Sequence, residues 1–232
     1  CPTRCAYCSF IAQDAVHKAK LLGPYVDAVI SETSTFFSQP GRELPISAVY
    51  VGGGTPTSLP NDLFAKFLQG TLIRLPLLPG VEITVEAGRP DTITAEKLQV
   101  IRDIKATRLC INPQTFHDAT LERIGRRHTT GQTVEAFKLA RSLGFQSINM
   151  DLIAGLPGET PEDFADSLDR ALVLAPDSIT VHTLALKRSS KLQQERLTAG
   201  CHHGLPDPAL AAMLHKAQQK LADAGLLPYY LY

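Results

Sequence analysis

Short apolar runs alternate with amphipathic stretches along almost the whole chain, and this alternation restricts the possible folds more than any other feature. Five runs have the length and composition of buried strands; they cover residues 46–51, 81–87, 108–112, 147–152 and 178–183. The stretches beside them have apolar residues at helical spacing; they cover residues 17–38, 61–73, 94–104, 130–143, 161–174 and 208–224. Strands that alternate with helices of this length predict parallel βαβ units with right-handed crossovers, and therefore an α/β fold.

The length of the chain favours a single α/β domain over residues 1–232. No linker or change of composition divides it, and the polar stretch 187–205 is the expected long loop. The chain begins on a residue of its most distinctive motif and ends on an abrupt aromatic segment. We therefore expect a fragment of a longer protein, without its amino- and carboxyl-terminal parts.

The charges of the chain are balanced, with 23 basic and 23 acidic side chains. No overall field therefore favours nucleic acid or an anionic membrane surface as a partner. The sequence shows no signal peptide and no apolar run long enough to span a membrane. The expected location is the cytoplasm, whose reducing conditions suit free thiols.

Three cysteines lie within the first eight residues, at Cys1, Cys5 and Cys8. Three thiolates at this spacing can converge on one inorganic centre but cannot fill four coordination positions, so an iron–sulfur cubane held here would keep one iron open. A closed zinc site would need a fourth protein ligand, and none follows nearby. Disulfide pairing does not suit the total of five cysteines, an odd number. The spacing alone leaves an open cluster, zinc and unligated thiols as alternatives.

Polar and glycine residues stand where the predicted strands end. The glycine turn, residues 52–56, allows a close backbone approach and exposes amide donors, but it lacks the lysine of a P-loop and the spacing of a dinucleotide fingerprint. Glu86, Gln114, Arg126 and Asp151 stand at or beyond the following strands. Because parallel α/β folds build their sites at the carboxyl ends of strands, these groups together could bind the ammonium and carboxylate of an amino acid and a ribose diol.

These motifs occur in an order that resembles the radical S-adenosylmethionine (SAM) superfamily and, within it, the oxygen-independent coproporphyrinogen III oxidase family, in its coproporphyrinogen dehydrogenase branch. The resemblance covers nearly all of the chain. It is carried by the three cysteines, the glycine turn, Glu86 and the segments 112–116, 124–129 and 149–158.

The resemblance implies a partial (β/α)6 barrel whose first strand lies upstream of Cys1. It implies that Cys1, Cys5 and Cys8 hold a [4Fe–4S] cluster and that Tyr7 packs beside it. The implied SAM contacts are Gly53, Gly54, Thr55, Glu86, Gln114, Arg126 and Asp151. It assigns no further catalytic side chain in this sequence.

The implied reaction begins with reductive cleavage of SAM to methionine and a 5′-deoxyadenosyl radical, with electrons from an unidentified low-potential donor. The radical abstracts hydrogen from propionate side chains of coproporphyrinogen III, carbon dioxide leaves, and protoporphyrinogen IX results, which is a step of haem biosynthesis. The family's oxidases carry a further cysteine two positions after the third ligand, where this chain has Phe10. Haem-chaperone relatives also lack that cysteine, so the alternative is a radical SAM protein that binds and transfers haem without decarboxylation.

The remaining candidates have simpler interpretations. Cys201, His202 and His203 are metal-binding residue types, but adjacent ligands point in different directions, so a chance loop cluster is favoured. Cys110 lies in an apolar run and is expected to be a small buried side chain. The turn 155–160 is interpreted as structural, with Thr160 as a helix N-cap. His128, His182 and His215 show no pattern that separates a core position from a surface position, and a zinc-stabilised α/β module is a more distant alternative function.

Overall fold

The computed structural model describes residues 1–10, 18–42, 44–199 and 207–229. Its strands are β1 (Ile46–Val51), β2 (Leu77–Glu86), β3 (Arg108–Gln114), β4 (Ile148–Ala154) and β5 (Ser178–Thr183). Its α-helices are α1 (Ala19–Phe37), α2 (Asn61–Leu72), α3 (Ala95–Asp103), α4 (Asp118–Arg123), α5 (Thr130–Ser142), α6 (Pro161–Val173), α7 (Lys191–Ala199) and α8 (Asp207–Asp223). Two single 3₁₀ turns, η1 (Pro56–Ser58) and η2 (Pro90–Thr92), follow β1 and β2.

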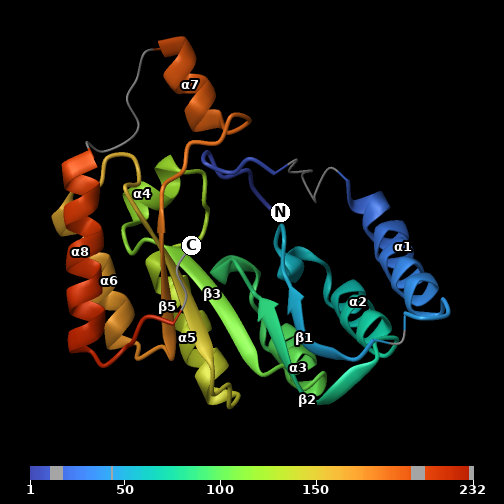
Figure 1. Ribbon diagram of the computed structural model, residues 1–232. Helices are drawn as coiled ribbons and strands as arrows, with labels where there is room; N and C mark the ends of the chain where they lie inside the picture. Colours follow the sequence, from blue (N-terminus) through green and yellow to red (C-terminus); the bar gives the residue numbers. More distant parts are fainter. Residues whose placement is uncertain (11–17, 43, 200–206, 230–232) are drawn as a thin grey trace.

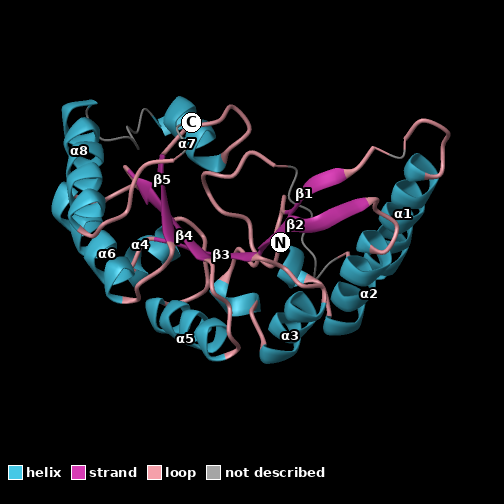
Figure 2. Cartoon of the chain, turned by 60° about the horizontal axis from the view of Figure 1, so that its bottom comes forward, coloured by secondary structure: helices cyan, strands magenta, loops and turns pink. Residues whose placement is uncertain are grey.

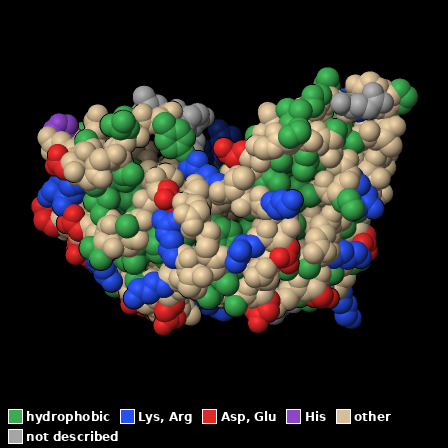
Figure 3. Space-filling view, turned by 90° about the horizontal axis from the view of Figure 1, so that it is seen from below, with side chains coloured by type: hydrophobic (Ala, Val, Ile, Leu, Met, Phe, Trp, Pro, Cys, Tyr) green, Lys and Arg blue, Asp and Glu red, His purple; other side chains and the backbone are tan. Residues whose placement is uncertain are grey.

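The five strands form one parallel sheet in the order β1-β2-β3-β4-β5, so each strand pairs with the next one along the chain. The sheet curls into an open half-barrel, and helices α1, α2, α3, α5, α6 and α8 lie along its convex side, whereas α7 lies beyond the strand ends (Figures 1 and 2). Figure 3 shows the outline hollowed on the concave side, between the two ends of the sheet, and charged side chains gathered along the convex rim. The predicted α/β class and partial barrel are confirmed.

The main core lies between the convex face of the sheet and the helices. Phe64 of α2, Leu98 of α3, Phe137 of α5 and Phe164 of α6 pack there against the strands. From β4, the residues in contact with this core are Ile148, Met150, Leu152 and Ala154. Because side chains alternate along a strand, Asn149, Asp151 and Ile153 face the concave side instead. The concave face therefore receives the polar residues of this strand.

Helix starts follow local capping chemistry. Thr160 caps α6 in a reciprocal capping box with Asp163, as the sequence predicts, and Thr129 caps α5 in the same way with Gln132. The capping boxes therefore fix the first residue of each helix, directly after a loop.

The structure corrects three expectations. α4 was not predicted, because six residues are too few for a helical period to be recognised. α7 lies inside the stretch predicted to be a loop. It is mostly polar; its Leu192 is buried, and the Leu192 N–H donates to the Ala6 carbonyl. β2 begins at Leu77 rather than at residue 81, because an irregularity in the pairing of β1 with β2 accommodates Pro79 and Gly80.

The remaining expectations concern the other cysteines and a possible membrane span. Cys110 is buried as expected, and burial raises the pKa of its thiol to about 12. Cys201, His202 and His203 lie outside the described residues. Within the described parts of the chain, no helix combines the length and apolar character needed to cross a bilayer.

Candidate active site

The first ten residues, which we call the cysteine loop, lie over the carboxyl ends of the strands (Figure 1). Ala6 N–H donates to the Ile124 carbonyl at 2.9 Å, and the Ala6 carbonyl accepts from Leu192 N–H at 3.0 Å. The loop is thereby fixed between the end of α4 and the start of α7. Its cysteines, at positions 1, 5 and 8, are partly exposed and form no disulfide with one another.

The glycine turn meets the first cysteine directly. The Cys1 Sγ lies 3.3 Å from Thr55 Oγ1, and a Cβ built on Gly54 would lie 3.5 Å from the same sulfur. The structure therefore brings two predicted site residues into contact with a predicted cluster ligand. Gly53 contributes its backbone N–H, which donates to Glu86 Oε2 at 3.2 Å.

Glu86 ends β2 and is half-buried beside the glycine turn. Its second oxygen, Oε1, accepts from Asn112 Nδ2 at 3.2 Å. Burial raises the pKa of Glu86, the Gly53 hydrogen bond opposes this rise, and the nearby charge of Asp151 adds to it. A second carboxylate close enough to influence Glu86 makes this part of the concave face suited to a cationic group.

Asp151 lies on the concave face of β4. It accepts from Asn149 Nδ2 at 2.6 Å, and its Oδ2 lies 3.8 Å from His182 Nε2 of β5. The hydrogen bond to Asp151 raises the pKa of His182. Asn112, Asn149 and His182 lie at this site but are absent from the predicted set. Asn112 and His182 stand near the carboxyl ends of β3 and β5, which was the available signal, whereas Asn149 stands at the start of β4 and gave none.

Arg126 is buried, with only 6 % of its surface exposed. Its Nη2 donates to the carbonyls of Gly88 at 2.9 Å and Asn112 at 2.8 Å, and Nη1 donates to the Tyr7 hydroxyl at 3.2 Å. Its Nε lies 3.4 Å from His128 Nδ1. All these acceptors are uncharged, so the guanidinium keeps its full charge available to an anionic ligand group.

Tyr7 fixes the middle of the cysteine loop. Its ring packs against a small apolar cluster beneath the loop, formed by Leu121, Ile124, Ile153 and Leu156. Burial raises the pKa of Tyr7 to about 12; the Arg126 charge opposes this rise, and the Cys5 thiol adds to it. The phenol therefore stays protonated between a predicted cluster ligand and the buried arginine.

Gln114 ends β3 with an unusual backbone. Its φ of 71° lies in the left-handed region, and the pairing of β3 with β4 shifts register between Ile111 and Gln114. Such irregularities cost energy and occur at functional sites, where they redirect a side chain. Gln114 is buried at this bend.

The chemistry of the donors fits an iron–sulfur cluster better than a single ion. Among the residues that the structure describes, no three His, Cys, Asp or Glu side chains converge closely enough to hold one metal ion. A four-iron cluster is larger than one ion and is held by thiolates alone. Three thiols in one loop, with no imidazole or carboxylate between them in the sequence, match that donor set.

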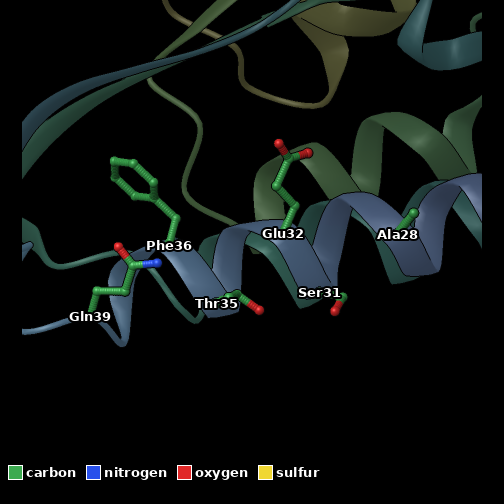
Figure 4. A pocket seen from close by; sticks show the side chains of 6 residues that line it. All are labelled: Ala28, Ser31, Glu32, Thr35, Phe36 and Gln39. Atoms are coloured by element: carbon green, nitrogen blue, oxygen red, sulfur yellow. The ribbon is translucent and has the colours of Figure 1, made fainter.

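The site is open on the outer side of the cysteine loop. A cavity of about 880 Å³ lies between residues 2–4 and residues 125–129. A second hollow, of about 480 Å³, lies along α1, but Figure 4 shows Glu32 and Phe36 extending from one side of the helix and Ser31 and Thr35 from the other. These α1 side chains do not converge, so the cysteine loop remains the candidate site.

Comparison with known proteins agrees with this geometry. The family model described as the radical SAM superfamily matches residues 1–171, well over half of the chain. The chain belongs to the radical SAM superfamily. Radical SAM proteins use a [4Fe–4S] cluster and SAM, so the cofactor prediction is confirmed. One similar fold, the methyltransferase TsrM from Kitasatospora setae, was solved with cobalamin and a [4Fe–4S] cluster bound, at a TM-score of 0.58 and 17 % identity.

Within the radical SAM superfamily, the chain is similar to proteins of two named activities. It is 38 % identical to the oxygen-independent coproporphyrinogen-III oxidase-like protein HemZ of Bacillus subtilis, over 100 % of this chain and 46 % of HemZ. It is 30 % identical to the haem chaperone HemW of B. subtilis, over 99 % of this chain and 59 % of HemW. Coproporphyrinogen III oxidase HemN from Escherichia coli matches at a TM-score of 0.81 and 27 % identity, over 97 % of this chain and 51 % of HemN. The chain therefore spans about half the length of these relatives.

Proposed function

We propose that the protein containing this chain is an oxygen-independent coproporphyrinogen III dehydrogenase, which decarboxylates coproporphyrinogen III oxidatively to protoporphyrinogen IX. The observation that carries the proposal is the loop of three thiols, of which Cys1 meets the glycine turn, in a half-barrel of which 97 % matches HemN. The family resemblance of the segments around Glu86 and Gln114 supports the same branch. Residues 1–232 would be the radical SAM core domain of this protein.

The proposed roles follow from where the side chains lie. Cys1, Cys5 and Cys8 hold the [4Fe–4S] cluster, which when loaded supplies the electron that cleaves SAM reductively. The half-buried carboxylate of Glu86, reinforced by Asp151, favours a positively charged ligand group beside the glycine turn. The proposed SAM contacts are Gly53, Gly54, Thr55, Glu86, Gln114, Arg126 and Asp151.

The protein's own residues would also protect the chemistry. Tyr7 and the apolar cluster beneath the cysteine loop exclude water from the inner side of the thiols. The three cysteines are partly exposed, which suits delivery of electrons by a separate low-potential donor.

The test uses the full-length protein, reconstituted anaerobically with iron and sulfide. With a low-potential reductant, SAM and coproporphyrinogen III, we expect methionine, 5′-deoxyadenosine and protoporphyrinogen IX, each measured by liquid chromatography with mass detection. The Cys5→Ser variant, which leaves only two thiols, should give none of them. A cluster-loaded protein that cleaves SAM and leaves the porphyrinogen unchanged would contradict the proposed substrate.

The second candidate is a haem chaperone. It is favoured by the similarity to HemW and by Phe10, which stands where the oxidase pattern has a further cysteine. Such a protein would bind haem in a one-to-one ratio and pass it to an apo-acceptor, and haem titration followed by an acceptor assay would measure both. No haem binding at micromolar protein would remove this candidate.

A further inference from the structure

Arg89 is buried directly behind the cysteine loop, with 2 % of its surface exposed. Its guanidinium forms a two-pronged pair with Asp91, with Nε to Oδ1 at 3.0 Å and Nη2 to Oδ2 at 3.2 Å. The remaining nitrogen, Nη1, donates to Thr3 Oγ1. Paired guanidinium–carboxylate hydrogen bonds fix an arginine in orientation as well as position. Arg89 therefore presents a fixed donor to the cysteine loop.

Thr3 lies between the first two cysteines. It connects the cysteine loop to the segment after β2 and to the segment after α4. Its hydroxyl accepts from Arg89, which follows β2, and donates to the Gly125 carbonyl, beyond α4, at 2.8 Å. On the same side, a Cβ built on Gly125 would lie 2.8 Å from the Arg4 carbonyl oxygen, and the φ of Gly125 is +77°. The loop thus lies closely against the rim at the position that Thr3 fixes.

The Arg89 backbone contacts a buried network of polar side chains. The Arg89 carbonyl lies 2.8 Å from Thr92 Oγ1, and that hydroxyl lies 2.7 Å from Thr57 Oγ1. Lys97 of α3, 8 % exposed, donates to the carbonyls of Thr57 at 2.6 Å and Thr92 at 3.2 Å. Thr57 directly follows the glycine turn, so the network joins this turn, the loop after β2 and the cysteine loop.

The Arg89–Asp91 pair is an inefficient way to increase the free energy of unfolding. The Arg89 side chain is 3 % exposed and that of Asp91 19 %, so the guanidinium loses hydration that its attraction to Asp91 repays only in part, and an apolar side chain of similar volume often stabilises a fold as well. What the pair provides here is a directional contact to the segment that separates two thiols. Partners that orient metal ligands typically change metal affinity 10- to 100-fold when they are removed.

We propose that Arg89 is a positioning residue for the cluster. It holds Thr3, and through Thr3 it sets the placement of Cys1 relative to Cys5. The inference rests on the proposed role of the three thiols as cluster ligands. Asp91 and the Thr57–Thr92–Lys97 network keep Arg89 in this orientation.

The test compares variants of the full-length, anaerobically reconstituted protein. Arg89→Lys keeps the charge but loses the two-pronged pair, and Thr3→Val keeps the shape but loses the hydroxyl. Thr3→Ser restores the hydroxyl, and Arg102→Met removes an exposed arginine of α3 as a matched control. The readouts are the rate of iron loss to a chelator, the electron paramagnetic resonance spectrum of the reduced cluster, and the thermal unfolding midpoint.

Arg89→Lys and Thr3→Val should lose iron roughly tenfold faster or more and show altered spectra. Thr3→Ser and Arg102→Met should match the wild type. Unchanged iron loss and spectra in Arg89→Lys and Thr3→Val would overturn the inference, even if both unfold at a lower temperature. If Arg89→Lys does not fold, Thr3→Val decides alone. A wild-type protein that cannot be loaded would overturn the proposed function as well, whereas a loaded wild type with indifferent variants would overturn only the role of Arg89.

Discussion

We expect the ionised Glu86 side chain to lower the stability of the fold and to strengthen SAM binding. Its raised pKa means that ionisation is less favourable in the folded chain than in the unfolded chain, so the ionised form reduces stability at neutral pH. We therefore expect Glu86→Gln to leave the thermal unfolding midpoint unchanged or slightly higher. The same change should weaken SAM binding roughly tenfold or more, because a hydrogen bond to a charged group contributes about 1.5–3 kcal/mol.

Calorimetric titration of SAM into the cluster-loaded protein would measure this loss, and thermal unfolding of the same samples would measure stability. The control is Glu96→Gln, an exposed carboxylate in the first turn of α3 that lies away from the site. Equal SAM affinity in the Glu86→Gln variant and the wild type would exclude Glu86 from the binding site.

His128 predicts an acid sensitivity of the fold. Burial and the neighbouring Arg126 charge lower the pKa of His128 from 6.5 to about 4. Because the unfolded chain then binds the proton more readily, the contribution of His128 is complete above pH 6.5 and is lost as the pH falls from there toward 4. Urea unfolding of His128→Gln should show a shallower loss of stability over that range than the wild type. Parallel curves would contradict a buried, neutral His128.

The contact between the cysteine loop and the segment after α4 helps to position the cysteines. Substitution of Gly125, which lies in this contact, tests its importance. Gly125→Ala would place a Cβ 2.8 Å from the Arg4 carbonyl at a φ of +77°, so it should destabilise the fold and displace the cysteine loop. Gly144→Ala, at a φ of +85° with nothing within 4 Å, has the same backbone strain without the clash and should cost about 1–2 kcal/mol.

Gly131→Ala, in the first turn of α5, would place a Cβ in ordinary contact with Thr129 Oγ1, at 3.7 Å, and should be neutral or stabilising, because alanine is the better helix former. Urea unfolding and iron content after reconstitution would separate the three variants. If Gly125→Ala lost no more stability or iron than Gly144→Ala, close contact between Arg4 and Gly125 would not matter for the loop.

The sequence predicts best those strands and helices that are long enough to show their repeat of apolar residues. β1 and β5 match their predicted ranges residue for residue. Pro45 and Gly52 bound β1, and β5 alternates polar and apolar residues after Pro176. α7 was missed because its placement depends on Leu192 meeting the cysteine loop, a contact between distant parts of the chain. Glu86 ends its strand as predicted, whereas Asp151, expected at a strand end, lies in the middle of β4 because the strand continues to Ala154. The Arg89–Thr3 contact could not be predicted, since no spacing relates residues 86 positions apart.

The half-barrel leaves β1 at one edge of the described sheet, paired with β2. Ser47, Ala48 and Tyr50 of this strand are exposed, and an edge with open backbone groups favours pairing between molecules. We expect residues 1–232, expressed alone, to self-associate as concentration rises, and Ala48→Lys to reduce this association. Sedimentation velocity over a range of concentrations would measure both, and Lys66→Gln on α2 is a surface control. A monodisperse wild-type segment would contradict the expectation.

The fastening of the cysteine loop to the start of α7 bears on how the protein matures. Ser189 Oγ donates to the Ser9 carbonyl at 3.0 Å and Leu192 N–H to the Ala6 carbonyl, so the loop is completed by residues about 180 positions later in the chain. During synthesis the three thiols leave the ribosome well before these partners exist. We therefore expect the cysteine loop to reach its folded position only after residues 189–192 have been made, so that a cluster would be inserted late in synthesis or after it.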